Sequence, residues 1–420
     1  MPIRCASARL FACLCSAAAL ALTVSGCANK TAPSGGGGTG PGGGSNTIII
    51  GEYGSLTGDK STFGHSTDNG VELAVKAINA AGGVSAHTLT VALEDDAGTP
   101  DGASSVVKKI ITSSKPTAVI GEVASTLSIQ AAPICNAAKV PMISPSSTNP
   151  KVTQTGPYVF RVCYIDPFQG TAGAKFASGT LHAKKAAILT DAANDYSIGL
   201  TKFFTESFTQ GGGQVTLAQN YGKDDVDFTS QLTQIKATNP DVLYVPGYYG
   251  QVGPIAKQAR AIGLNVPLLG GDGWDSEKLY EIGGVALEGS YFSNHYSVDD
   301  PSPRIQEFVA KFKKTYAGQL PDSLAAQAYD ATGMLADAMK RAKDLSGPSI
   351  RDALAATKDF HGVTGDISMD ENRNPVKQAV VLKISKGGKY EFVARILPEG
   401  AALAQAPSAP QAPQAPPDKK

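Results

Sequence analysis

Short apolar runs alternate along residues 47–163 with segments whose apolar positions recur at helical spacing. Each run has four or five residues, the length of a buried strand. In one intervening segment, 67–81, the positions of Val71, Val75 and Ile78 share one helical face, and Gly82 follows as a helix stop. The strands predicted here are 47–50, 89–93, 117–120 and 140–143, with helices at 67–81, near 106–111 and at 127–138.

The alternation restarts after residue 163. It predicts strands at 186–190, 214–218, 241–245 and 267–269, and helices at 198–210, 228–238, 251–262, 276–282, 303–316 and 323–343. A hairpin-like pair, 377–385 and 389–396, closes the pattern. Alternation of strands and helices is typical of an α/β fold, a parallel sheet covered by helices on both faces. Two such runs in succession predict two doubly wound lobes with a cleft between them.

The two ends of the chain follow a different pattern. In residues 1–27, Arg4 and Arg9 precede an apolar run at 10–24, which is typical of a secretory signal and is too short for a good spanning helix. Val-Ser-Gly-Cys, ending at Cys27, resembles the lipobox of bacterial lipoproteins, which implies that Cys27 becomes the lipid-bearing N-terminus. An ordinary secretory signal with a chance Cys is the alternative.

The remaining segments define the predicted organisation. Residues 28–46 form a Gly-rich tether, and 397–420 form an Ala/Pro/Gln-rich tail that we expect to be disordered. We expect a hinge of three chain crossings, near 163, 293 and 363. The predicted lobes are 47–163 plus 294–362, and 164–293 plus 363–396.

Charge and cysteine content narrow the class of protein. The chain has 37 basic and 37 acidic residues, and loss of residues 1–27 would leave 35 and 37, so nucleic acid is not the expected partner. Of six Cys, only Cys135 and Cys163 lie in the predicted fold. They could pair in an oxidising compartment. Their apolar contexts favour two buried thiols instead.

Six predicted strands are followed by loops of small and polar residues. The loops are GEYGSLTGDKSTFGHS, GEVASTLS, SPSSTNP, DAANDYS, PGYYGQ and GGDGWDS. Parallel sheets bring such loops together at their carboxyl edges, where open α/β sheets bind ligands. The loop after 140–143 offers Ser144, Ser146, Ser147 and Thr148 but no acid, base, Cys or His, so it is suited to holding a polar group rather than breaking bonds.

The loops of the two halves differ in chemistry. Those of the first half offer hydroxyls and N–H groups at helix N-termini, which bind anions without a cationic side chain. Those of the second half offer Tyr196, Tyr248, Trp274 and Asp272, a set suited to a cation with an apolar body. Together they predict a site for a zwitterion such as an α-amino acid.

In this hypothesis the ligand carboxylate lies on Ser125 and the groups around Ser146 and Thr148, and the ammonium lies on Asp272 beside Tyr248. Any single loop could instead be a simple turn or helix cap. Glu52, Glu122 and Asp275 also follow strands, so Asp272 is one of several possible acids.

Eight segments, in order, resemble the branched-chain amino-acid-binding proteins of ABC importers, which have the type I periplasmic binding fold. They are GSLTG (54–58), NGVELAVKAINAAGGV (69–84), GEVAST (121–126), VPMISPSSTNP (140–150), FRVCYIDPFQG (160–170), NDYSIGL (194–200), VPGYYGQVG (245–253) and LLGGDGWDS (268–276). The resemblance covers essentially all of 47–396.

The resemblance implies a role for each matching residue. Ser125, Ser146 and Thr148 would bind the ligand carboxylate, and Asp272 the ammonium, with Tyr196 and Tyr248 on the same lobe. Phe63 would line the side-chain pocket. Better-known members join two Cys at the positions of Gly98 and Ala124, so their disulfide is absent here.

Other classes of site fit poorly. GGDGWDS has too few oxygen ligands for calcium, GTGPGGGS lies in the tether rather than before a helix, and the five His show no metal-ligand spacing. We therefore expect no metal, no cofactor and no catalysis. The prediction is a monomeric, lipid-anchored protein of the periplasm or cell envelope that captures an amino acid, most plausibly branched-chain, and delivers it to an ABC permease. Alternatives are a receptor for a small amide, urea or aromatic acid, and an adhesion or structural lipoprotein.

Overall fold

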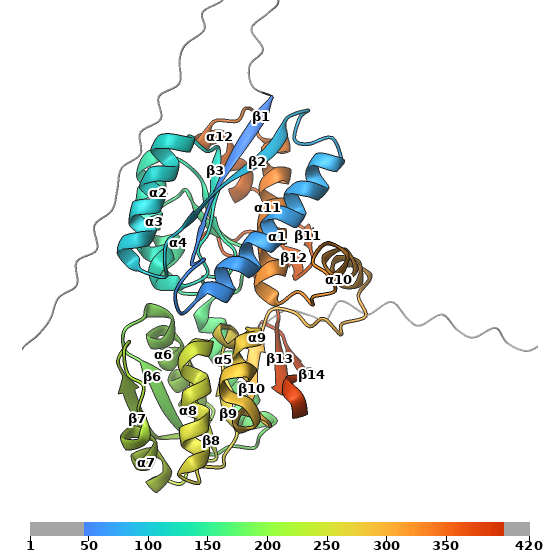
Figure 1. The fold of residues 1–420 in the computed structure, drawn as a ribbon. Coiled ribbons are helices and arrows are strands. Elements are labelled where there is room, and N and C mark those ends of the chain that lie inside the picture. Colours follow the sequence, from blue (N-terminus) through green and yellow to red (C-terminus); the bar gives the residue numbers. More distant parts are fainter. Residues whose placement is uncertain (1–45, 399–420) are drawn as a thin grey trace, which may run out of the picture. The chain divides into compact units, whose positions relative to one another are not determined.

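The computed structural model describes residues 46–398 (Figure 1). The predicted signal, the lipid-bearing Cys27, nearly all of the tether and the tail from residue 399 lie outside the described residues. Within the described part of the chain, no helix has the length and apolar character needed to cross a membrane.

The first sheet has five parallel strands in the order β2-β1-β3-β4-β5. Their bounds are β1 Thr47–Gly54, β2 Thr88–Asp95, β3 Ala118–Ile120, β4 Met142–Ser144 and β5 Val159–Arg161. Figure 1 shows α2 (Pro100–Lys109) and α3 (Ser125–Ala138) on one side of this sheet and α1 (Ser61–Ala80) and α11 (Ser323–Arg341) on the other. Strands covered on both faces are buried throughout, which explains the continuous apolar runs in the sequence.

The second sheet has seven strands in the order β14-β13-β10-β9-β8-β6-β7. Their bounds are β6 Lys185–Asp191, β7 Gln214–Tyr221, β8 Val242–Tyr244, β9 Leu268–Gly270, β10 Tyr291–Asn294, β13 Ala379–Ile384 and β14 Tyr390–Ile396. β6 to β10 are parallel, whereas β13 runs antiparallel to both β10 and β14. The predicted C-terminal hairpin is therefore confirmed as an antiparallel edge on a parallel sheet.

Helices also cover the second sheet. They are α5 Asp166–Gly179, α6 Asp195–Gln210, α7 Thr229–Ala237, α8 Tyr249–Ala261 and α9 Glu277–Gly283. α5 packs against α6, and α8 packs against α9. The two-sheet α/β architecture predicted from the sequence is thus confirmed.

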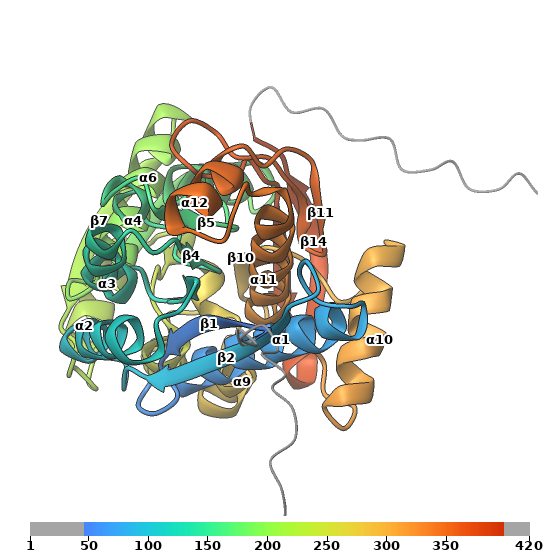
Figure 2. The ribbon, with the colours of Figure 1, turned by 90° about the horizontal axis from the view of Figure 1, so that it is seen from above.

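The chain returns to the first lobe after β10. α10 (Pro303–Thr315) packs through Phe308 and Phe312 on α1 and α11, beside which it lies in Figure 2. The remaining elements are α4 Lys151–Gln154, α12 Gly347–Ala355, β11 Phe360–Gly362 and β12 Gly365–Ile367, with short helical turns η1 Ile110–Ser114, η2 Asp272–Trp274, η3 Gly284–Leu287 and η4 Lys386–Gly388.

The third crossing between the lobes lies later in the chain than residue 363. Residues 365–374 were assigned to the second lobe, yet Arg373 donates to the Val159 and Thr153 carbonyls of the first lobe, at 3.1 and 2.7 Å. The chain joins the second sheet only with β13 at Ala379. The hydrogen bonds of the partly buried Arg373 thus hold residues near 373 against the first lobe.

The three crossing segments contact one another. The Tyr164 ring stacks on His295 at a centroid distance of 3.9 Å. Lys377 Nζ, which is buried, donates to the Val162 carbonyl at 3.1 Å. Cys163, in the first segment, and Cys135 are both buried free thiols, as the sequence favoured, and burial raises the pKa of each thiol to about 12.

Candidate functional site

The hydroxyl loop, residues 144–148, begins where β4 ends and is almost completely buried. Ser144 Oγ donates to the Glu122 carbonyl at 2.6 Å and accepts from Ser147 N at 2.8 Å. Ser147 Oγ donates to the carbonyls of Glu122 and Val123. These two hydroxyls therefore hold the loop against β3 and α3, and Ser146 and Thr148 are the members left for a ligand.

Ser146 and Thr148 differ in their partners. Ser146 Oγ donates to Gln327 Oε1 on α11 at 2.9 Å. Thr148 Oγ1 is fully buried and makes no hydrogen bond of normal geometry to any residue within 46–398, although it lies near the buried Asp166 carboxyl and lowers the pKa of that group. An unsatisfied buried hydroxyl costs about 1–3 kcal/mol. Thr148 is therefore a candidate for a polar contact that a ligand completes.

The N-terminus of α3 lies next to this loop. Ser125 is its first residue, and its Oγ accepts a hydrogen bond from Asn149 N at 3.2 Å. The preceding residue, Ala124, gives no side-chain cap; its own N–H donates to the Glu122 carboxyl group, and Leu127 N donates to the Ala124 carbonyl at 3.0 Å. The first two N–H groups of the helix keep their positive partial charge. A carboxylate at this position is stabilised without a cationic side chain in the loop.

Asp272 follows β9 on the second lobe and is 4% exposed. Its Oδ1 accepts from Gln169 Nε2 at 2.7 Å and from Tyr196 Oη at 2.8 Å, and its Oδ2 lies 2.9 Å from His295 Nε2. An ionised carboxylate accepts about four hydrogen bonds. Asp272 therefore retains room for about one more donor, on Oδ2.

His295 is the unexpected partner of Asp272. It lies directly after β10, is 1% exposed, and its Nδ1 makes no hydrogen bond to any described residue. Burial lowers the pKa of His295, whereas the hydrogen bond to Asp272 opposes this shift. A neutral imidazole with its proton on Nε2 donates that proton to Asp272 Oδ2.

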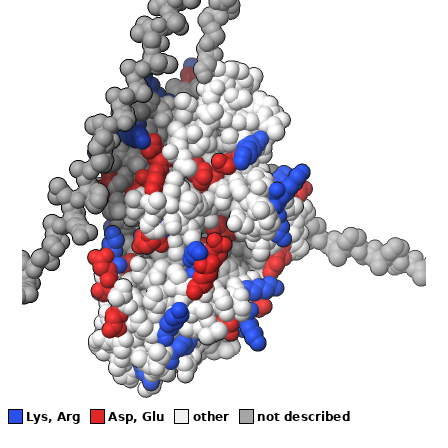
Figure 3. All heavy atoms as spheres, in the orientation of Figure 1, with Lys and Arg blue, Asp and Glu red and all other residues white. Residues whose placement is uncertain are grey.

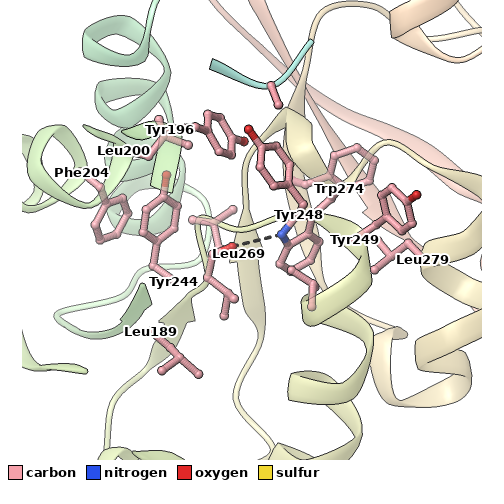
Figure 4. Close-up of a cluster of buried hydrophobic side chains, with 14 of the residues drawn as sticks. Leu189, Tyr196, Leu200, Phe204, Tyr244, Tyr248, Tyr249, Leu269, Trp274 and Leu279 are labelled. Carbon is pink, nitrogen blue, oxygen red and sulfur yellow. Dashed lines mark hydrogen bonds between the residues drawn. The ribbon is translucent and has the colours of Figure 1, made fainter. Parts of the chain in front are cut away.

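Aromatic side chains form the rest of the site. Tyr196 and Tyr248 stack with ring centroids 5.1 Å apart, and both rings lie side by side in Figure 4. Phe63, from α1 of the other lobe, meets Tyr248 and Tyr249 edge-on at 5.7 and 5.0 Å. Trp274 lies behind them and donates to the Val245 carbonyl at 3.1 Å, so it anchors the Asp272 turn rather than facing a ligand (Figure 4).

The predicted residues meet at one very small cavity, with a volume of about 10 Å³. Five of the seven predicted ligand-binding residues line it, together with three that the sequence did not single out. The lining residues are Phe63, Ser146, Tyr196, Tyr248 and Asp272, and the additional three are Val123, Gly273 and Leu324. Ser125 and Thr148 are adjacent to this lining but are not part of it.

Contacts between the lobes surround this cavity. Asp195, the first residue of α6, accepts from Lys151 Nζ at 2.7 Å and exchanges hydrogen bonds with the Thr126 side chain at 2.9 and 3.3 Å. On the other side, Thr62 and Ser276 hydroxyls lie 2.9 Å apart. The described conformation is therefore one in which the lobes close on the site.

Sequence reasoning missed three polar residues of this region. Gln169 and His295 hold Asp272, and Asp166 is fully buried with no hydrogen-bond partner for either carboxylate oxygen among the described residues. Burial raises the pKa of Asp166 to about 8, and the neighbouring Thr148 hydroxyl opposes the shift. Asp166 and Gln169 both lie in the DPFQG segment. Two polar residues so close to the predicted lobe crossing near 163 were the feature of the sequence that could have marked them as part of the site.

Two further observations bear on the class of site. In the described part of the chain, no group of three His, Cys, Asp or Glu side chains is placed to hold a metal ion. On the face drawn in Figure 3, acidic and basic side chains are interspersed rather than gathered by sign.

Known structures share this architecture. The leucine binding protein LivK from Thermotoga maritima is 39% identical with a TM-score of 0.80, covering 84% of this chain and 99% of its own. LivJ from Streptococcus pneumoniae, solved with isoleucine, is 35% identical with a TM-score of 0.78, covering 83% and 99%.

A third structure carries a different ligand. A solute binding protein of an ABC transporter from Rhodopseudomonas palustris, solved with 3,4-dihydroxybenzoic acid, is 28% identical with a TM-score of 0.75, covering 84% and 97%. A family model described as a periplasmic binding protein matches residues 47–389. The sheet topology, the two-lobed cavity and this match over most of its length show that the chain belongs to the periplasmic binding protein family.

Proposed function

We propose that this protein captures a branched-chain amino acid by closing its two lobes on the zwitterion and delivers it to an ABC permease. The observation that carries the proposal is the arrangement around the cavity. An uncapped helix N-terminus and an unsatisfied Thr148 hydroxyl lie on one lobe, and the Asp272 carboxylate lies on the other. Such a pair matches the two opposite charges of an amino acid in sign.

The apolar part of the ligand would lie among Phe63, Tyr248 and Leu324, which line the same cavity from both lobes. Closure removes the ligand from water, which strengthens its polar contacts. The named ligands of LivK and LivJ support this assignment. The proposal includes a lipid anchor at Cys27, a monomeric state and a place in the cell envelope, all of which rest on the sequence.

A second candidate is an aromatic carboxylic acid, favoured by the dihydroxybenzoate complex of the Rhodopseudomonas palustris protein. Such a ligand has the carboxylate but lacks the ammonium. It would therefore leave the remaining acceptor position of Asp272 unfilled at the buried site, which costs binding energy. The amino acid is therefore the first candidate.

The test is isothermal titration of the protein with L-isoleucine, L-leucine, isovaleramide and 3,4-dihydroxybenzoate at pH 7. We expect the amino acids to bind at least about 100-fold more tightly than the other two, because only they pair with Asp272. Binding of the benzoate without binding of either amino acid would transfer the assignment to the second candidate. A thermal-shift series with the same compounds checks the ranking independently.

A further inference from the structure

A buried cation lies beneath the hydroxyl loop, which itself contains no Lys or Arg. Arg161, at the end of β5, is 0% exposed. Its Nη1 donates to the Ser147 carbonyl at 2.5 Å and its Nη2 to the Asn149 carbonyl at 2.8 Å. The guanidinium thus grips the backbone of the loop that is proposed to hold the ligand carboxylate.

This guanidinium is not neutralised by a paired carboxylate. Within residues 46–398, no acid lies within ion-pair distance of Arg161, and its Nε has no hydrogen-bond partner. Burial lowers the pKa of Arg161, and the negative charges of Asp166 and Asp370 oppose this shift. An Arg side chain stays protonated in proteins, so a full positive charge is buried here. Burying such a charge without an anion is costly.

The Ser147–Thr148 peptide connects this charge to the ligand-binding side of the loop. The peptide is trans, because the one cis bond described is Gly121–Glu122. In a trans peptide the N–H points away from the carbonyl oxygen. Arg161 holds the Ser147 oxygen, so the Thr148 N–H points to the opposite side of this peptide. The adjoining Ser146 lines the cavity.

The second gripped carbonyl has a different effect. It belongs to the Asn149–Pro150 peptide, which has no N–H because Pro150 lacks one. That bond braces the loop but transmits no donor to the other side. The hydrogen bond of Arg161 to the Asn149 carbonyl therefore only fixes the loop, whereas its hydrogen bond to the Ser147 carbonyl also polarises the Thr148 N–H donor.

We propose that Arg161 is a positioning residue that supplies the counter-charge for the ligand carboxylate through the Ser147–Thr148 peptide. The inference rests on the proposed amino-acid-binding function and deepens it. The carboxylate accepts from Thr148 N–H, and the guanidinium on the far side of that peptide attracts it from about 7 Å, the span of two hydrogen bonds and one peptide. A unit charge at that distance, with an effective dielectric constant of about 20, changes affinity by roughly 50-fold.

The experiment compares two ligands on matched variants of the full chain. L-Isoleucine carries the carboxylate, whereas L-isoleucinamide keeps the ammonium and side chain but lacks the negative charge. The quantity measured by titration calorimetry is the ratio of their affinities. In Arg161→Gln, which keeps hydrogen-bond donors but loses the charge, we expect this ratio to fall by roughly 10- to 100-fold relative to the original protein.

Arg161→Lys and Arg373→Gln are the controls. Arg161→Lys keeps the charge without the forked grip, so the ratio is expected to stay within about threefold of the original even if the melting temperature falls. Arg373 also donates to backbone carbonyls of the first lobe, at Val159 and Thr153, but not to the hydroxyl loop. Its replacement is expected to affect stability and to leave the ratio unchanged.

A purely bracing role for Arg161 predicts equal losses for both ligands in every variant, and that result would overturn the inference. If Arg161→Gln does not fold, Arg161→Lys decides alone: a fall of the ratio by more than about threefold, although the positive charge is kept, would also overturn the inference. Failure of the original protein to bind either L-isoleucine or L-leucine would instead refute the proposed function. The two failures are therefore distinguished in one set of titrations.

Discussion

Replacement of Asp272 by Asn removes one charge from the centre of the site while preserving its shape. Asn keeps an oxygen where Oδ1 accepts from Gln169 and Tyr196, so these two hydrogen bonds persist. The change falls on Oδ2, next to His295, where the ligand ammonium is proposed to bind. The variant is therefore expected to fold, with its melting curve as the check.

The magnitude follows from the burial of this group. Asp272 is 4% exposed and lines a small cavity, so we expect that water does not replace the lost partner of the ammonium. Leaving a buried charge unpaired at an interface costs about 2–5 kcal/mol. This corresponds to roughly 30- to 5000-fold weaker binding of L-isoleucine, measured by titration calorimetry.

Asp191→Asn is the matched control. Asp191 is also a nearly buried acid at the end of a strand of the second lobe, but it accepts from Ala193 N and Asn194 and does not line the cavity. We expect less than about threefold change there, as for a substitution away from the ligand. Unchanged binding of L-isoleucine in Asp272→Asn, with a normal melting curve, would refute the zwitterion assignment.

Three further predictions follow from the same geometry. Phe63→Ala should weaken L-isoleucine binding at least about tenfold in calorimetry, because a buried ring that meets Tyr248 and Tyr249 is lost; equal affinity would place the side-chain pocket elsewhere. Asp195→Ala should speed ligand dissociation about two- to fivefold in stopped-flow experiments, because its contacts with Thr126 and Lys151 are partly exposed and worth about 0.2–1 kcal/mol; slower release would contradict a closing role. Burial raises the pKa of Glu122 to about 8, so between about pH 5 and 8 the folded state keeps a proton on this carboxyl that the unfolded state releases. The free energy of unfolding should therefore fall as the pH rises from about 5 to 8. If Glu122→Gln shows the same pH dependence of the melting temperature, the dependence belongs to other groups.

Much of the fold was predictable because both sheets are buried on two faces and leave continuous apolar runs. The elements missed were those without such a signal. α5 is rich in small residues and buried around most of its circumference, so it shows no apolar face. β5 has only three residues and ends on Arg161, which nothing in the local pattern marks as buried. α1 begins at Ser61 rather than 67 because its first turn is polar.

The candidate site was predictable where a loop follows a strand and was missed where distant segments meet. The hydroxyl loop and Asp272 follow β4 and β9 directly. The sequence did not mark His295 as a site residue, because no other His lies at the spacing of a metal site. Its actual partner is an acid, Asp272, which lies 23 positions earlier in the chain. The loops that contain Gly98 and Ala124 carry no disulfide. Ser55 connects them instead, because its hydroxyl lies within hydrogen-bond distance of Asp96 in the first loop and of Glu122 in the second.

A crystal structure of the protein with L-isoleucine tests the central claim most directly. We predict that the ligand carboxylate accepts from Thr148 N–H and lies at the N-terminus of α3, while its ammonium donates to Asp272 Oδ2 in the closed cleft. An isoleucine bound outside this cleft, or bound in it with the carboxylate toward Asp272, would contradict the account.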